Sequence, residues 1–240
     1  VTGALGKMGG ILASLVEKAP DMEIAARVDK FSEGGEVYKN IVDYSGEADV
    51  IIDFSHHTLA REYLSYARER KIAFVMATTG HDEAEKAEIK AASEDIPVFW
   101  SANMSMGIAL LAKMAKEAAK VFPDADIEIV EAHHNRKLDA PSGTALLLAE
   151  AVRESRPDMR LVEGRSGMAK REKGDVGVSA LRMGNLAGMH EVIVCTETQS
   201  LTLKHEVYDR ALFAEGALEA ARFLMGKAPG MYDMKRIIAG

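Results

Sequence analysis

The sequence predicts an α/β protein of two domains, on the strength of three observations. Over residues 1–104, apolar runs typical of buried strands alternate with helical patterns, as in a parallel sheet covered by helices. A G-x-x-G-x-x-G loop at residues 3–9 stands between a strand end and a helix. After residue 104 the alternation stops, and the last strand-like runs follow one another without helices. We therefore expect an N-terminal Rossmann-like domain and a C-terminal α+β domain with an open mixed sheet.

The elements of the first domain follow in order. Strands are expected at 1–2, 24–29, 50–55, 73–79 and 97–103, with helices after the glycine loop, over 58–70 and over 83–94. Asp82, with Glu85 three residues later, predicts a capping box at the start of the helix over 83–94. The Gly-rich, polar residues 31–48 are expected to form a loop with weak structure. Because a glycine loop normally follows a complete strand, we expect the start of the first strand to precede Val1.

The second domain begins with one amphipathic helix. Helices are expected over 107–122 and 143–155, a strand over 127–132, a charged loop over 163–175, and strands over 176–182, 189–197 and 199–208 that pair antiparallel. A last helix over 211–226 precedes a short tail and is expected to return to the first domain. The predicted division is therefore 1–104 with 210–240, and 105–209.

Composition and charge exclude several classes of protein. The 240 residues are 48% hydrophobic and 28% charged, as in an ordinary globular chain. The net charge of −7 argues against nucleic acid and against an anionic membrane surface as partners. Cys195 is the single cysteine, so no internal disulfide forms, which suits a cytoplasmic protein. No apolar run approaches the roughly 20 residues that span a bilayer, and no signal peptide is apparent.

The glycine loop predicts a dinucleotide site. Gly3 permits the tight turn, Gly6 lets a pyrophosphate approach the backbone, and Gly9 allows the helix to pack closely on the sheet. Asp29 ends the second strand, where an acid would bind a ribose hydroxyl, and Lys30 beside it is placed to meet a 2′-phosphate. The alternative is a plain βα turn with a solvated Asp-Lys pair.

Two further turns follow strand ends. The residues are Ala77-Thr78-Thr79-Gly80 and Ser101-Ala102-Asn103. Ligands of open α/β sheets bind along the carboxyl ends of the strands, so we interpret these turns as contacts for the nicotinamide end of the cofactor. Ordinary loop chemistry is the alternative for both.

A compact group of proton donors and cations lies in the second domain. His133, His134 and Lys137 follow the strand over 127–132, and Ser142-Gly143-Thr144 then opens a helix. The free N–H groups and positive dipole end of a helix start attract anions. The stretch therefore predicts a site for a small acidic molecule that gains or loses protons.

The two histidines also raise the possibility of a metal site, completed by His190, His205 or Cys195. Adjacent residues of a strand point to opposite faces, so both histidines cannot easily serve one ion. No H-x-x-x-H or C-x-x-C spacing is present. We expect no metal. The remaining alternative is structural, with one buried histidine and one at the surface.

The block EAHHNRKLDAPSGTA, residues 131–145, resembles the dihydrodipicolinate reductase family, the 4-hydroxy-tetrahydrodipicolinate reductases of bacterial lysine and diaminopimelate synthesis. The resemblance covers the whole chain and includes the glycine loop, the ATTG and SAN turns, and the tail G-x-Y-D-M. The central block is specific, whereas the glycine loop is shared with many dehydrogenases.

The resemblance implies an enzyme that uses NADH, NADPH or both to reduce a cyclic imine with two carboxylates. His133 resembles the family's proton donor/acceptor and Lys137 its proton donor. The implied substrate ligands are His134, Ser142, Gly143 and Thr144. The implied cofactor contacts are Gly3, Ala4, Leu5, Gly6, Lys7, Met8, Asp29, Lys30, Ala77, Thr78, Thr79, Ser101, Ala102, Asn103 and Met104. A homotetramer, assembled through the second domain's sheet, and closure about hinges near 103–107 and 208–211 are further expectations.

The chain departs from the family pattern in three places: Ala77 replaces a frequent Gly, Met189 replaces a frequent acid, and the loop over 55–58 is short.

Two other functions remain open on the residues alone. One is a different two-domain NAD(P)-dependent dehydrogenase acting on an amino-acid-like substrate, which would not need H-H-x-x-K before P-S-G-T. The other is a nucleotide-sensing protein without chemistry, which has no use for His133 and Lys137.

Overall fold

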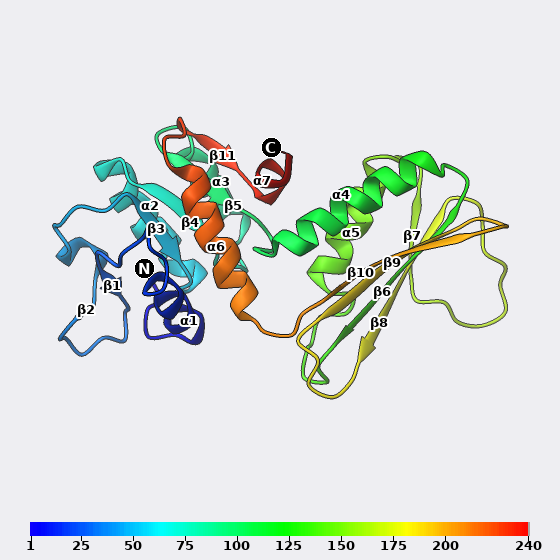
Figure 1. Cartoon of the computed structure of the whole chain (residues 1–240), viewed down its shortest axis with the longest axis horizontal. Coiled ribbons are helices and arrows are strands. Elements are labelled where there is room, and N and C mark those ends of the chain that lie inside the picture. The colour runs from blue at the N-terminus through cyan, green and yellow to red at the C-terminus, as the bar shows by residue number, and fades with distance from the viewer. Residues whose placement is uncertain (240) are drawn as a thin grey trace. The chain divides into compact units, whose positions relative to one another are not determined.

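The structure is a computed structural model that describes residues 1–239. The chain divides into two compact units. The first unit joins Val1–Ser105 to the segment from Ala211 onward, so the red and orange end of the chain belongs with the blue one (Figure 1). The second unit is the continuous segment Met106–Arg210.

The first unit contains a parallel sheet. Its strands are β1 (Arg27–Val28), β2 (Val37–Tyr38), β3 (Val50–Asp53), β4 (Ala73–Met76), β5 (Pro97–Trp100) and β11 (Gly230–Tyr232). Hydrogen bonding gives the order β11-β5-β4-β3 and a separate β1-β2 pair. Thr2 bridges both Val28 and Asp53 in parallel, so the segment before the glycine loop lies between β1 and β3. This is the order of a doubly wound dinucleotide-binding sheet.

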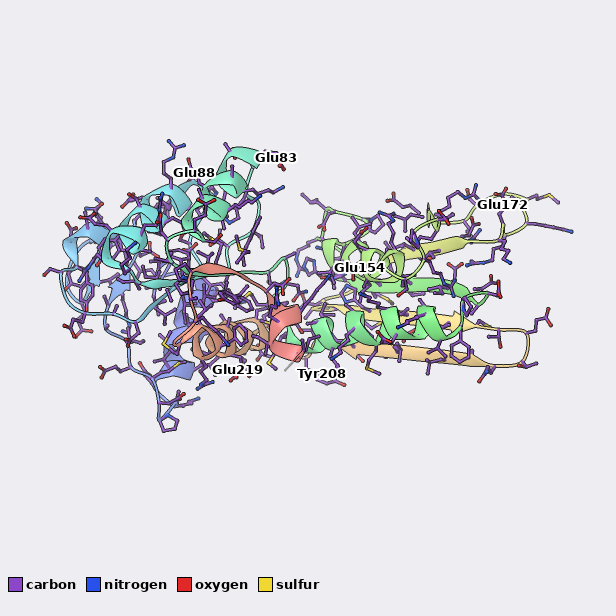
Figure 2. All side chains as sticks on the ribbon, turned by 90° about the horizontal axis from the view of Figure 1, so that it is seen from above. Glu83, Glu88, Glu154, Glu172, Tyr208 and Glu219 are labelled. Carbon is purple, nitrogen blue, oxygen red and sulfur yellow. The ribbon has the colours of Figure 1, made fainter. Side chains whose placement is uncertain are left out.

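Helices cover this sheet. They are α1 (Lys7–Val16), α2 (Ala60–Arg70), α3 (Glu83–Ala92), α6 (Ala211–Leu224) and α7 (Met234–Ala239), with 3-10 turns η1 (Ile41–Asp43) and η2 (His57–Leu59). The helix α6 packs against α1, β4 and β5, and α2 packs against α3 and β4. Asp82 accepts a hydrogen bond from the Glu85 N–H and Glu85 accepts one from the Asp82 N–H, which confirms the predicted capping box. Figure 2 shows Glu83 and Glu88 on the outer side of α3.

The second unit is a five-stranded sheet with two helices on one face (Figure 1). Its elements are α4 (Met106–Val121), β6 (Asp126–His133), α5 (Gly143–Arg153), β7 (Arg160–Glu163), β8 (Asp175–Arg182), β9 (Met189–Cys195) and β10 (Ser200–Glu206). Alternate residues of the central strands, among them Ile127, Ile129 and Val192, pack with α4 and α5 in one core. The sheet is mixed, so the predicted fold class is confirmed for both units.

One predicted pairing is wrong. We expected 176–182 to pair antiparallel with the strands that follow it. The observed order is β10-β9-β6-β8-β7, in which β8 lies parallel to both β6 and β7, and only the β9 pairs are antiparallel. The reason is a pair of crossovers. The helix α5 carries the chain from β6 to β7 at the edge of the sheet, and the connection over 164–174 then returns it so that β8 lies parallel between β6 and β7.

Other differences are local. The loop expected over 31–48 contains β2 and η1, the tail contains β11 and α7, and β7 precedes the charged loop. The strand expected over 24–29 is limited to Arg27 and Val28, which pair with the two residues of β2. Residues 24–26 instead line a cavity of about 910 Å³. Within residues 1–239, no helix has the length and apolar character needed to cross a membrane.

Candidate functional site

The glycine loop is shaped by two close backbone approaches. Gly3 has φ +70°, and a Cβ there would lie 2.5 Å from the Phe54 carbonyl oxygen. A Cβ on Gly9 would lie 2.2 Å from the Gly3 carbonyl oxygen. No larger residue fits either position without moving backbone. Gly6 is exposed and precedes α1 with no side-chain cap, so the helix start presents backbone N–H groups.

Asp29 connects this loop to the end of β1. Its carboxylate accepts hydrogen bonds from the Leu5 N–H and from the Phe31 N–H, each at 3.0 Å. The side chains of Leu5 and Phe31 are themselves exposed. The ammonium group of Lys30 lies 5.1 Å from the centre of the Phe31 ring. Asp29, predicted to bind a ribose hydroxyl, and Lys30, predicted to meet a 2′-phosphate, therefore lie next to the exposed ring of Phe31.

The end of β3 is organised by Asp53, a buried residue that sequence reasoning did not single out. One carboxylate oxygen accepts from the Thr2 hydroxyl at 2.6 Å and the other from the Thr78 hydroxyl at 2.7 Å. The Ser55 N–H donates to the same carboxylate at 3.0 Å. Asp53 therefore joins Thr2, the end of β3 and the turn after β4 at the edge where a doubly wound sheet binds its ligand.

The two predicted turns lie at the ends of β4 and β5. Thr78 is buried, whereas Thr79 is exposed, and the Ala77 N–H donates to the Asp53 carbonyl at 3.0 Å. In the second turn the Ser101 hydroxyl donates to the Asn103 carbonyl at 2.9 Å. The nearby Ala102 is exposed and Met104 is buried. Both turns therefore present backbone at the same carboxyl edge.

Two histidines, His57 and His81, contact Glu85 at the start of α3. The His57 Nδ1 lies 2.8 Å from a carboxylate oxygen of Glu85, and His81 lies 3.6 Å from the other. The hydrogen bond from His57 is the main reason that the pKa of Glu85 lies below its usual range. This contact fastens the loop at 55–58 to the start of α3.

These residues fit a dinucleotide. A cradle that only glycine can form, an uncapped helix start and an acid at the end of β1 meet the three requirements of pyrophosphate and ribose binding. Among residues 1–239, by contrast, no three His, Cys, Asp or Glu side chains form a group suited to a metal ion.

In the second unit the carboxylate of Glu131 joins the predicted catalytic elements. Glu131 is fully buried. It accepts a hydrogen bond from His133 Nδ1 at 2.6 Å and another from the Ser142 N–H at 2.9 Å. Arg182 donates to both carboxylate oxygens, each at 2.9 Å. Burial alone would raise the pKa of Glu131, but the hydrogen bonds from Arg182 and His133 outweigh burial and hold the pKa below its usual range.

Ser142 begins α5 as predicted. Its hydroxyl accepts from the Ala145 N–H at 3.2 Å, as an N-cap does, and lies 3.2 Å from His190 Nε2. The rings of His190 and His133 meet edge to face with centres 5.1 Å apart. Burial, and then the charge of His133, lowers the pKa of His190 to about 4, so His190 is neutral at physiological pH.

His134 and Lys137 lie on the following turn. His134 Nε2 is 3.3 Å from the Arg210 guanidinium. Burial and the charges of Arg136 and Arg210 lower the pKa of His134. The Lys137 ammonium is paired with Asp139 at 2.8 Å, and this contact holds the pKa of Asp139 below its usual range. Residue types and spacing did not predict this pairing of Lys137 with Asp139.

The start of α5 is open. Gly143 is exposed, and a Cβ there would meet no atom within 4 Å. Thr144 follows it, half-buried. His133 is therefore joined to Ser142 through one carboxylate, and the helix start next to it has space for a ligand.

Comparison with known proteins identifies the family. A family model for the N-terminus of dihydrodipicolinate reductase matches residues 1–104, and a model for its C-terminus matches residues 107–238. The chain belongs to the dihydrodipicolinate reductase family. A 4-hydroxy-tetrahydrodipicolinate reductase of Caldanaerobacter subterraneus is 43% identical over 99% of this chain and 96% of its own length. The corresponding protein of Clostridium tetani is 41% identical over 98% and 94%.

A solved structure shares the fold of this dihydrodipicolinate reductase family member. The dipicolinate-bound dihydrodipicolinate reductase of Paenisporosarcina superposes with a TM-score of 0.80 at 24% identity, over 98% of this chain and 97% of that one. The resemblance drawn from the central block is thus confirmed, as is the expectation of a nicotinamide-dependent oxidoreductase.

Sequence reasoning missed Glu131 and Arg182. Glu131 had one available signal, because it lies two residues before His133 and so shares its face of the strand. Arg182 gave no signal, since it is 51 residues away in sequence. Met189 pairs with Ala132 and lies on the opposite face of β9 from His190, so it takes no part in this network.

Proposed function

We propose that this chain catalyses the NADH- or NADPH-dependent reduction of 4-hydroxy-tetrahydrodipicolinate to tetrahydrodipicolinate, in the diaminopimelate route to lysine. The observation that carries this proposal is family membership along nearly the whole chain, with relatives of that name at 43% and 41% identity. The network of Glu131, His133 and Ser142 supports it chemically, because it brings a proton-transfer group and a helix start together.

The substrate is a cyclic imine with two carboxylates. We assign one carboxylate to Ser142, Gly143 and Thr144 at the start of α5, a helix end that attracts anions. The Ser142 N–H is held by Glu131, so we assign the anion to the N–H groups of Gly143 and Thr144, with Ser142 as the N-cap that fixes this turn. His134 contributes a ring to the same site, and the positive surroundings come from Arg136 and Arg210, whose charges add to burial in lowering the pKa of His134. Because the whole chain has a net charge of −7, these local groups must overcome an unfavourable background field.

Proton transfer is assigned to His133 and Lys137. The substrate hydroxyl leaves as water, which gives a conjugated ring system. A bound nicotinamide would supply the hydride that reduces this system, and the protein orients the substrate and delivers the proton that balances the hydride. His133 holds its Nδ1–H against Glu131, so Nε2 is the atom that exchanges a proton with the substrate. Lys137 donates from Nζ once its ammonium leaves Asp139 for the substrate. A positioned acid contributes about 10²- to 10⁴-fold to the rate.

The cofactor is assigned to the glycine loop, to Asp29 with Lys30, and to the turns at 77–79 and 101–104. The Lys30 ammonium lies over the Phe31 ring, next to Asp29. We assign Lys30 to a 2′-phosphate and Asp29 to the hydroxyl of an unphosphorylated ribose. We therefore expect both NADH and NADPH to serve, and we assign no metal to the reaction.

The assembly that we propose is a cytoplasmic homotetramer formed through the sheet of the second unit. The sheet face opposite α4 and α5 presents Val130, Ile193 and the exposed Leu181. Apolar residues on an uncovered sheet face are typical of an interface. Light scattering of the purified protein should give four times the mass of one chain, and a monomer would contradict the assembly.

One assay tests the reaction. The condensation product of pyruvate and aspartate semialdehyde is supplied with NADH or NADPH, and oxidation of the nicotinamide is followed. Turnover is expected with this substrate. Nicotinamide binding without turnover would overturn the proposal in favour of a nucleotide-sensing protein.

The role of Lys137 is tested by substitution. We expect Lys137→Ala to lower kcat by at least about 10²-fold, because a general acid is removed. NADH affinity should be nearly unchanged, since the dinucleotide is assigned to the first unit. Lys120→Ala, at an exposed lysine of the same unit, is the matched control and should keep full turnover. Near-normal turnover of Lys137→Ala would remove Lys137 from the mechanism.

A further inference from the structure

A buried carboxylate of the second unit, that of Glu131, has no assigned role in the reaction. Glu131 has no solvent exposure, and both of its oxygens are occupied. Oε2 accepts from His133 Nδ1 and from Arg182, and Oε1 accepts from the Ser142 N–H and from the second Arg182 nitrogen. A carboxylate with this many donors is held as an ionised acceptor.

The position of Glu131 follows from strand geometry. Glu131 and His133 lie two residues apart on β6, so both side chains point to the same face of the sheet. Arg182 lies directly opposite His133 on the neighbouring parallel strand β8. The contact is therefore fixed by two paired strands rather than by a mobile loop.

The bond to Glu131 determines which nitrogen of His133 is available. An ionised carboxylate can only accept, so the hydrogen of the 2.6 Å contact belongs to His133 Nδ1. Nε2 is then the acceptor of the neutral ring and the donor of the charged ring. It faces Gly188, where a Cβ would lie 3.2 Å from it, so the absence of a side chain at this position leaves room around the ring.

The neighbours of the pair limit its charge. Arg182 lies on the carboxylate and offsets its negative charge, and the adjacent His190 is neutral at physiological pH. Among these side chains, His133 is the one to which proton transfer is assigned. The same carboxylate also fixes the Ser142 N–H, which ties the start of α5 to the proton-transfer histidine.

We propose that Glu131 is a positioning residue: through its bond to Nδ1 it fixes the His133 ring so that Nε2 exchanges the proton, and it stabilises the charged ring, while Arg182 balances its own charge. This inference rests on the proposed function for its catalytic meaning. Its structural content, the protonation of Nδ1, does not depend on the substrate.

The first test is Glu131→Gln, which keeps the shape of the side chain and removes its charge. We expect kcat to fall about 10- to 100-fold, as when the partner that orients a histidine is lost. KM for NADH should be little changed. The alkaline limb of the kcat profile should move to lower pH by about one pH unit, because the charged ring loses a nearby anion.

A control and a stability measurement distinguish positioning from a purely structural role. Glu128→Gln removes a carboxylate from the same strand on the opposite face, where it pairs with Arg165 and Arg171, and should leave the pH profile in place. If Glu131→Gln lowers thermal stability and activity without moving the alkaline limb, the carboxylate is structural and the proposal is overturned.

A second measurement applies even if Glu131→Gln does not fold. Nitrogen-15 NMR of the wild-type protein, with its seven histidines labelled and His133 assigned through His133→Asn, reports which ring nitrogen carries hydrogen. We expect Nδ1–H in the neutral ring, and Nε2–H would overturn the proposal. A protein that shows Nδ1–H but reduces no substrate would contradict the proposed function and leave the role of Glu131 as a fixed structural partner.

Discussion

At the scale of single residues, His190 shows how burial changes a titration. It lies beneath Ser142 and beside His133, and its pKa is lowered from 6.5 to about 4. The unfolded chain therefore binds a proton near pH 6.5 while the folded chain does not. The stability that depends on neutral His190 is complete above pH 6.5 and is lost as the pH falls toward 4.

The expected loss can be measured. Each tenfold change in proton affinity corresponds to about 1.4 kcal/mol, so His190 should contribute about 3 kcal/mol to the loss in free energy of unfolding between pH 6.5 and pH 4. Urea unfolding of His190→Gln across this range should show a shallower pH dependence than the wild type. The exposed His56, changed to Gln, should keep the wild-type slope. Equal slopes for wild type and His190→Gln would contradict this account.

Residue types and spacing predicted much of the candidate site, but not how its charges pair. His133, Ser142 and Asp29 were found because they follow strand ends or open a helix. The pairing of Lys137 with Asp139 was missed, since both residues lie in a turn whose geometry depends on the loop opposite, where the His134 N–H binds the Leu186 carbonyl at 2.8 Å. The contact of Glu131 with Arg182 joins two strands that are neighbours in the sheet but distant in the sequence, so it leaves no local sequence pattern.

At the scale of elements, the glycine loop and α1 offer adjacent positions with opposite requirements. Gly9→Ala would place a Cβ 2.2 Å from the Gly3 carbonyl oxygen, so we expect a loss of about 1–3 kcal/mol in the free energy of unfolding, together with weaker NADH binding. Gly10→Ala meets no atom within 4 Å and should stabilise the helix by about 0.5–1 kcal/mol.

Calorimetry and NADH titration of the two variants check this prediction. The comparison is matched, because the same substitution is made at consecutive positions of one helix. If Gly9→Ala bound NADH as tightly as Gly10→Ala, the close packing of the loop on α1 would not be needed for the cofactor.

Elements with strong periodicity were predicted within a few residues, among them α4 and β6. The short ones were not: β2 and β11 have two and three residues, too few for an alternating pattern. The partner of β8 was mispredicted for a different reason. Apolar alternation specifies which face of a strand is buried, but it does not specify which neighbour pairs with its edges.

At the scale of the whole molecule, the chain leaves the first unit after Ser105 and returns to it at Ala211. The second unit is continuous and has its own core of α4, α5 and the central strands. We expect a fragment of residues 106–210 to unfold cooperatively by itself. A fragment of residues 1–105 should not, because it lacks α6, whose buried Ala214, Ala217 and Leu224 pack in the first unit.

Circular dichroism with thermal melting distinguishes the two fragments. Adding residues 211–240 as a separate peptide to the fragment 1–105 should restore a cooperative transition, since α6 packs against α1 and β11 pairs with β5. A sharp transition of 1–105 alone would show that the C-terminal segment is dispensable for this fold.

The late return of the chain has a consequence for its synthesis on the ribosome. When residue 105 has been translated, β5 has no neighbour on its outer edge, because β11 is the strand that covers it. At about 5–20 residues per second, the intervening segment delays α6 and β11 by roughly 5–20 s. An unpaired apolar strand edge is prone to associate with other chains during such an interval. We therefore expect the nascent residues 1–105 to depend on chaperones until α6 and β11 emerge. The second unit should fold as soon as its own residues are complete.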